Sequence, residues 1–142
     1  MLQDFKDIIC VINDDEQKIV WRVDDSNFET YNCLKQETEL LNKVKPYLKN
    51  NKVMIQAGGN CGLQIEKFAD YFDSVYTFEP DPINFHCLVN NLALMNVIKL
   101  QACVGKDRGT ASLNFYPNIG GFNVGKELSL RQRSVFFLRK IE

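Results

Sequence analysis

Residues 53–62 are Val-Met-Ile-Gln-Ala-Gly-Gly-Asn-Cys-Gly, and residues 75–80 are Val-Tyr-Thr-Phe-Glu-Pro. The first stretch is an apolar run that ends in a glycine cluster, and the second is an apolar run that ends in a carboxylate. Glu79 follows Gly59 by about 20 residues, which is the spacing of a strand–turn–helix–strand unit that holds a nucleoside. Glycine lets the backbone approach a ligand closely, and an acid at the end of the second strand accepts hydrogen bonds from a ribose diol. Together the two stretches predict a nucleoside-binding unit.

A helix is expected between these stretches, beginning near Gly62 and leading into a strand at residues 74–78. Its apolar residues recur at the spacing of one helix face, and they are Ile65, Phe68, Ala69 and Phe72. A second helix is expected to begin at Asp81, an N-cap residue, with Pro82 in the first turn. Its predicted core face consists of Phe85, Leu88, Val89 and Leu92.

A third strand is predicted at residues 97–104, after Asn96, which is expected to end the second helix in a left-handed conformation. The middle of the chain therefore has the order β-α-β-α-β. Right-handed crossovers place three parallel strands side by side with helices on their faces, which is half of a doubly wound, Rossmann-like α/β sheet. We expect no third β-α unit, so the strand at residues 53–57 has an open edge that allows self-association.

The N-terminal part is expected to pack on this core. Residues 7–13 and 18–23 are rich in β-branched side chains and predict a hairpin, whereas the polar residues 24–32 predict a loop. Apolar residues at helical spacing predict a helix at residues 38–48, and Pro46 is expected to kink or divide it.

The C-terminal part follows a different pattern. Ala111, Leu113 and Phe115 alternate as in a fourth strand, residues 117–124 predict a loop, and residues 125–142 are basic. The predicted domains are an N-terminal hairpin and helix at 1–50, a Rossmann-like half-domain at 51–116 and a basic irregular tail at 117–142.

Composition narrows the class of protein. A chain of 142 residues with a net charge of −1 predicts one soluble domain and gives no electrostatic reason to expect nucleic acid or a membrane as partner. Five scattered cysteines without a C-x-x-C pair predict neither a metal site nor a redox motif, and they favour reduced thiols in the cytoplasm. Cys61 in the glycine turn is a conceivable nucleophile, whereas His86 is expected at the surface or its boundary.

Taken one by one, the motifs have simpler interpretations. The glycine cluster can be a tight turn without a ligand, and Glu79 can be a solvated charge at a strand end. Their combination favours an adenosine-type ligand in the crevice beyond the carboxyl ends of the strands.

A chain of motifs over about residues 50–116 resembles the FkbM family of class I methyltransferases, which use S-adenosylmethionine. The motifs are Gln-Ala-Gly-Gly-Asn-Cys-Gly at 56–62, Phe-Glu-Pro-Asp-Pro at 78–82, Asn84-Phe85, Leu88, Asn91 and Ala102-Cys103-Val104-Gly105. The resemblance implies that Gly58, Gly59, Asn60 and Gly62 face the methionine part of the cofactor. It further implies that Glu79 binds the ribose hydroxyls and that Ala102 and Cys103 lie near the adenine.

Two departures from the family pattern affect what the resemblance implies. Gln56 stands where the family usually has an aspartate, which lowers the expected cofactor affinity by about 1–2 kcal/mol. Nothing after Pro117 matches the family's next strand and its Lys-x-Asp-x-Glu-Gly type of motif. A shortened or frame-shifted relative is therefore our hypothesis for this chain.

The expected function is methyl transfer from S-adenosylmethionine to an oxygen of a small molecule or sugar, and no residue is identified as the catalytic base. An NAD-dependent oxidoreductase is the first alternative, because Ala57-x-Gly59-x-x-Gly62 is an imperfect dinucleotide fingerprint. A non-catalytic half-domain that binds a nucleoside or pairs with another chain is the second.

Overall fold

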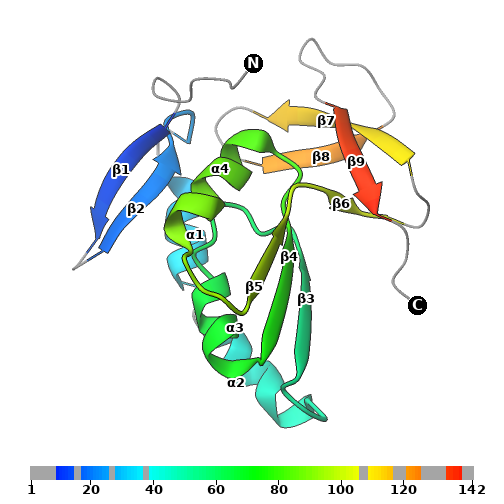
Figure 1. The fold of residues 1–142 in the computed structure, drawn as a ribbon. Coiled ribbons are helices and arrows are strands. Elements are labelled where there is room, and N and C mark those ends of the chain that lie inside the picture. The colour runs from blue at the N-terminus through cyan, green and yellow to red at the C-terminus, as the bar shows by residue number, and fades with distance from the viewer. Residues whose placement is uncertain are drawn as a thin grey trace.

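The computed structural model describes residues 9–14, 17–25, 28–36, 39–105, 109–116, 121–125 and 134–138. Figure 1 shows three groups of strands, with helices beside the central group. The N-terminal elements are β1 (Ile9–Asp14), β2 (Gln17–Arg22), α1 (Glu29–Gln36), α2 (Leu40–Val44) and the 3₁₀ helix η2 (Lys45–Tyr47). The central elements are β3 (Val53–Ala57), α3 (Ile65–Tyr71), β4 (Ser74–Phe78), α4 (Pro82–Asn91) and β5 (Val97–Leu100). The C-terminal strands are β6 (Cys103–Val104), β7 (Gly109–Tyr116), β8 (Gly121–Gly125) and β9 (Ser134–Leu138).

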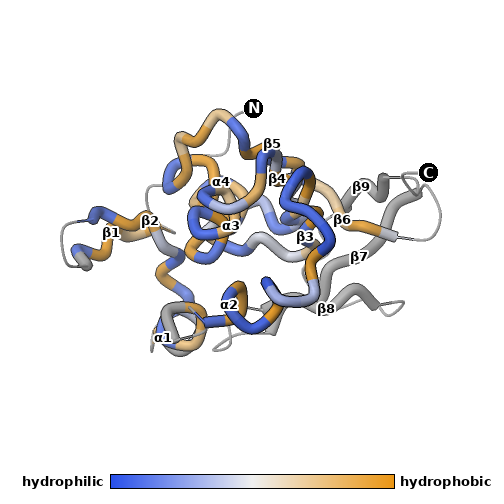
Figure 2. The backbone as a smooth tube through the Cα atoms, turned by 90° about the horizontal axis from the view of Figure 1, so that it is seen from below, coloured by the Kyte–Doolittle hydropathy of each residue, from blue (hydrophilic) through white to orange (hydrophobic). Residues whose placement is uncertain are grey.

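The central sheet has the strand order β3-β4-β5, and both of its strand pairs are parallel. This confirms the predicted β-α-β-α-β half of a doubly wound, Rossmann-like sheet, including the bounds of β3 and β4. Tyr76 pairs with Ile55 on one side and with Ile98 on the other, so these three residues form one row across the sheet. In Figures 1 and 2, α3 and α4 lie together on one side of this sheet.

The main apolar core lies between the sheet and the helices on that side. Val75 and Leu88 are fully buried there, together with the predicted face of α3: Ile65, Phe68, Ala69 and Phe72. Figure 2 shows hydrophobic segments, in orange, within this helical layer. The predicted helix began slightly too early, because the residues from Gly62 to Gln64 form turns before α3 starts at Ile65.

The predicted core face of α4 was wrong in part. Leu88 and Leu92 are buried, but Phe85 is half-buried and Val89 is 46% exposed. The buried residues within α4 are Ile83, Asn84, Cys87 and Leu88. The buried face of α4 differs from the predicted one because α4 packs on two partners, the sheet and the hairpin strand β2. With 10 residues α4 is far shorter than a bilayer span, and no helix among the described residues is long and apolar enough to cross a membrane.

The predicted N-terminal hairpin is confirmed by the antiparallel pair β1–β2. It is fixed to α4 by Asn91, whose side chain accepts from the Val20 N–H at 2.7 Å and donates to the Val20 carbonyl at 2.9 Å. Trp21 is fully buried, and its ring meets Tyr31 edge-on with a centroid distance of 5.3 Å. The hairpin is thus part of the folded core.

Two predictions between the hairpin and the second helix have different outcomes. The predicted loop at 24–32 was wrong over its second half, because α1 begins at Glu29. Tyr31 gives this polar segment one buried anchor against Trp21, which overrides its composition. The division of the next helix at Pro46 is confirmed, because α2 ends at Val44 and η2 carries the proline.

The predicted third strand and the helix end at Asn96 were also wrong in part. β5 ends at Leu100, and the backbone bends before β6, which joins a second sheet with the order β6-β9-β7-β8. α4 ends at Asn91, and Asn96 has no positive φ. The Asn96 side chain instead donates to the Ala69 and Phe72 carbonyls, which satisfies the end of α3.

The predicted fourth strand is confirmed as β7, which pairs antiparallel with β8 and β9. The predicted loop at 117–124 was wrong for β8, which begins at Gly121, and residues 117–120 lie outside the described residues. The tail at 117–142 is not irregular throughout, because Ser-Val-Phe-Phe-Leu at 134–138 forms β9. Its β-branched and aromatic residues favour a strand once β7 offers a free edge.

Candidate functional site

The candidate site lies at the carboxyl ends of the three parallel strands. The N–H groups of Gly58 and Gly59 both donate to the Phe78 carbonyl, at 2.8 and 3.0 Å. Beside them, the Glu79 N–H donates to the Leu100 carbonyl at 3.0 Å. The glycine turn, Glu79 and the end of β5 therefore meet at one edge of the sheet, as the strand order requires.

The Glu79 carboxylate points toward the glycine turn. One oxygen accepts from the Asn60 N–H at 2.7 Å, and the other accepts from the Asp81 N–H at 2.9 Å. Glu79 is only 5% exposed, and this burial raises the pKa of its carboxyl to about 7, against the opposing effect of the two N–H donors. Glu79 is therefore a buried acceptor that titrates near neutral pH.

The glycines of the turn have different local roles. Gly58 has a φ of 84°, and a Cβ placed there would meet nothing within 4 Å, so its bare backbone faces open space. A Cβ at Gly59 would lie 2.4 Å from the Thr77 hydroxyl oxygen and 2.7 Å from a Leu88 methyl carbon. Gly59 is therefore required for close packing of the turn on β4 and α4, whereas Gly58 lies beside open space.

The rest of the turn is held by its own geometry. Gly62 has a φ of 95°, and a Cβ there would press on Leu92. Asn60 has a φ of 48°, in the left-handed region that asparagine tolerates, and its side chain accepts from the Cys61 N–H at 2.6 Å. These contacts give the turn a defined shape without a bound molecule.

Ala102 follows the end of β5, where the Leu100 carbonyl accepts from both the Ala102 and the Glu79 N–H groups. It is 5% exposed, and its N–H donates to the Leu100 carbonyl at 2.9 Å. Burial raises the pKa of the neighbouring Cys103 thiol, and the charge of Glu79 raises it further.

Cys61 is placed as a packing residue. It is fully buried, and burial raises the pKa of its thiol well above the ordinary value, with Cys87 as the next cause. A thiol that is neutral and shielded is a poor nucleophile. His86 is half-buried on α4, which agrees with the boundary position expected from the sequence.

The N-cap role predicted for Asp81 is confirmed, but sequence reasoning missed the hydrogen bond from its N–H to Glu79 and the residues that contact its side chain. Asp81 caps α4 by accepting from the Ile83 and Asn84 N–H groups at 3.0 and 2.9 Å. Arg22 comes from the hairpin, is 1% exposed, and donates to Asn84 at 2.9 Å and to Asp81 at 3.3 Å. The Asn84 side chain also lowers the pKa of the Glu79 carboxyl, against the effect of burial. The signal for Arg22 in the sequence is that an arginine lies within the apolar run Lys-Ile-Val-Trp-Arg-Val at 18–23.

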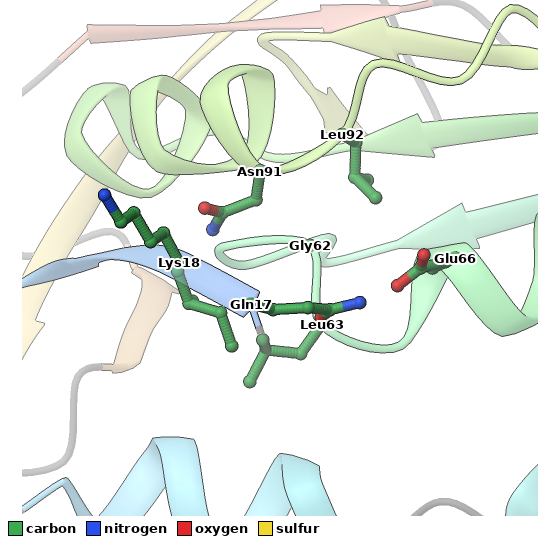
Figure 3. Close-up of a pocket in the computed structure, with 8 residues that line it drawn as sticks. Gln17, Lys18, Gly62, Leu63, Glu66, Asn91 and Leu92 are labelled. Carbon is green, nitrogen blue, oxygen red and sulfur yellow. The ribbon is translucent and has the colours of Figure 1, made fainter. Parts of the chain in front are cut away.

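A pocket of about 280 Å³ lies elsewhere, between the hairpin, the start of α3 and the end of α4 (Figure 3). Gly62 is its only lining residue that also belongs to the glycine turn. Its wall is mostly polar, with Gln17, Lys18 and Glu66 at the rim, and neither Glu79 nor Gly58 lines it. The pocket is thus separate from the Glu79 carboxylate and Gly58 at the strand ends.

Comparison with known proteins finds few similarities to this chain. No family model matches it, and no curated protein matches its sequence. Among solved structures, a match is found with the crystal structure of M. jannaschii TYW2 in complex with AdoMet, at 17% sequence identity and a TM-score of 0.44. The match covers 66% of this chain and 42% of the TYW2 chain, so the aligned part spans less than half of that structure.

Proposed function

We propose that this chain binds S-adenosylmethionine at the carboxyl ends of β3, β4 and β5, as the cofactor-binding half of a methyltransferase. The observation that carries the proposal is the Glu79 carboxylate, directed at the glycine turn and 2.7 Å from the Asn60 N–H. Beside it lies the backbone of Gly58, which faces open space. An acceptor and a bare backbone at this edge are what an adenosyl group requires.

The residues present fit such a cofactor. Each oxygen of an ionised carboxylate has more than one acceptor site, so Glu79 can accept from ribose hydroxyls while it keeps its two N–H donors. Gln56 lies on β3 just before the turn, and its side-chain oxygen accepts from the Thr77 hydroxyl at 3.1 Å. Gln56 is neutral, so it does not supply the negative charge that would favour the positively charged sulfonium of the cofactor.

The acceptor we propose is an oxygen of a small molecule or sugar, which rests on the resemblance to the FkbM family. The bound cofactor supplies an electrophilic methyl group. The chain's own contribution is to hold and orient the adenosyl part, since methyl transfer depends mainly on positioning and on exclusion of water. No side chain at the crevice is assigned as the general base.

Calorimetric titration with S-adenosylhomocysteine, and with NAD in parallel, tests the proposal. We expect the parent protein to bind S-adenosylhomocysteine and Glu79→Ala to bind it roughly 10- to 100-fold more weakly, the range for hydrogen bonds to a charged group. Glu66→Ala is the matched control, because Glu66 is exposed on α3 and lines the separate pocket of Figure 3, which does not include Glu79 or Gly58. Its affinity should equal that of the parent.

Three outcomes would contradict the proposal. The first is a folded parent protein that does not bind S-adenosylhomocysteine, and the second is equal binding by Glu79→Ala. The third is binding of NAD in place of S-adenosylhomocysteine, which would favour the oxidoreductase. Binding without methyl transfer to any sugar or small-molecule acceptor would leave the cofactor site standing and favour the non-catalytic half-domain.

A further inference from the structure

The strand β3 lies at one side of the central sheet, and within the described part of the chain it pairs with β4 alone. The Lys52 carbonyl accepts from the Ser74 N–H at 3.0 Å, and the Gly58 N–H donates to the Phe78 carbonyl at 2.8 Å. The residues that flank β3 at both ends therefore turn their backbone groups toward β4. Both have even numbers, and backbone direction alternates along a strand.

The odd-numbered residues consequently direct their N–H and C=O groups toward the outer edge. These are Val53, Ile55 and Ala57, and the structure gives no backbone partner for them on that side among the described residues. The same three residues also carry the exposed side chains of β3, with Val53 at 55% and Ile55 at 52% exposure. The outer edge of β3 thus has unpaired backbone groups, and apolar side chains are exposed beside it.

Nothing within β3 protects this edge. Natural edge strands usually carry a lysine, a proline or a bulge that prevents pairing with another chain. Residues 53–57 are Val-Met-Ile-Gln-Ala, which contain no charge and no proline, and they pair with β4 in unbroken register. Such an edge is suited to receive another strand.

We propose that β3 pairs with β3 of a second copy of this chain, antiparallel and centred on Ile55. In this register Ile55 lies opposite itself, and Val53 lies opposite the partner's Ala57. Only odd-numbered residues then face each other in hydrogen-bonded pairs, and these are the residues whose backbone groups point outward. The edge is therefore complementary to itself, as a two-fold dimer requires.

The charges agree with this register. Lys52 of one copy lies opposite the partner's Gly58, so the two lysines stand at opposite ends of the paired strands and no like charges face each other. Apolar side chains meet on the open face, through Ile55 with itself and Val53 with Ala57. A parallel pairing of the two copies is slightly less stable per residue, and packing of the two open faces would leave the edge groups unpaired.

Sedimentation velocity over a wide range of concentrations tests the dimer. We expect the parent to form a concentration-dependent dimer, and Ile55→Lys and Ile55→Pro to raise its dissociation constant at least about tenfold, which corresponds to about 1.4 kcal/mol. The lysines would face each other, and the proline would remove an N–H that the monomer does not use. Ile98→Lys is the control, because Ile98 is 38% exposed and lies in the same row of the sheet, away from β3.

Circular dichroism of each variant separates loss of pairing from loss of fold. A parent that stays monomeric at every concentration would overturn the proposal. It would also be overturned if both Ile55 variants, folded, dimerised like the parent, or if Ile98→Lys abolished the dimer as fully as they do.

Cross-linking tests the register independently. In a background with the exposed Cys33 replaced by serine, Ile55→Cys is expected to form a disulfide-linked dimer after oxidation with diamide. Directly opposed residues are about 5.5 Å apart between Cα atoms, which a disulfide spans. Val53→Cys is equally exposed but would lie roughly 13 Å from its counterpart, four strand positions away, and should not cross-link. Linkage through Val53→Cys in preference to Ile55→Cys would refute the register.

Discussion

The two sides of α4 are packed by different chemistry. Toward the sheet, Leu88 joins an apolar core with Val75 and the buried face of α3. Toward the hairpin, Cys87 joins a smaller apolar cluster with Trp21, and α4 begins at a polar junction, which consists of Arg22, Asp24, Asp81 and Asn84. The apolar core depends on volume and tolerates many partners, whereas the polar junction depends on each group finding its particular partner. Asp81 of this junction also donates its N–H to the Glu79 carboxylate in the candidate site. The region that depends on specific partners is therefore the one that positions Glu79.

Removing the cation of the polar junction is expected to have the largest effect. Arg22→Met takes the guanidinium away from the buried Asp81 carboxylate, and we expect the free energy of unfolding to fall by about 3–5 kcal/mol. Urea denaturation at pH 7 measures the change. The double variant Arg22→Met/Asp81→Asn keeps an N-cap residue and removes both charges, so it should recover much of the loss. A loss of less than about 1 kcal/mol for Arg22→Met would show that the junction is no more demanding than a surface pair.

A cavity in the apolar core is expected to lower the free energy of unfolding somewhat less than the loss of Arg22. Leu88→Ala removes a fully buried side chain, and unfolding should become easier by about 3 kcal/mol because the sheet and α3 close the space only in part. Val89→Ala is the matched control on the same helix, since Val89 is 46% exposed, and its stability should change by no more than about 0.5 kcal/mol. If the two variants lost equal free energy of unfolding, Val89 would belong to the core face of α4, as the periodicity of the sequence predicted.

The smallest expected effect concerns pH and rests on the proposed function. Burial raises the pKa of Glu79 to about 7, and ribose hydroxyls need the ionised carboxylate as acceptor. Below this pKa the protonated form predominates, so the affinity for S-adenosylhomocysteine should fall about tenfold from pH 8 to pH 6 and level off above pH 8. Calorimetry at several pH values measures it, with Glu79→Gln expected to show no such slope. If the affinity of the parent did not change with pH, Glu79 would not be in contact with the ligand.

The local elements around the glycine turn could be predicted because their signals are local. The apolar run at 53–57 ends at glycines, and Asp81 with Pro82 marks the start of α4, so the bounds of β3, β4 and the helix start agree with the structure. Right-handed crossovers then leave one arrangement for three such strands. The meeting of Glu79 with the turn follows from that arrangement.

The errors occur where a residue's environment comes from distant parts of the chain. Periodicity cannot show that α4 has a second partner, so Val89 was expected inside and Cys87 was overlooked. Arg22 resembles any charged residue near a strand end until the hairpin folds against α4. Asn96 serves the end of α3, which lies more than twenty positions earlier in the chain.

The order of residues alone settles the parallel three-stranded unit, the glycine turn and the acid that faces it, because these follow from local propensity, capping and the handedness of crossovers. Folding in three dimensions settles which glycine leaves space and which merely packs, which arginine supports Glu79, and that the backbone groups of Val53, Ile55 and Ala57 face outward. These properties depend on neighbours brought together from remote positions, and a sequence pattern carries no information about such neighbours until the chain has closed around them.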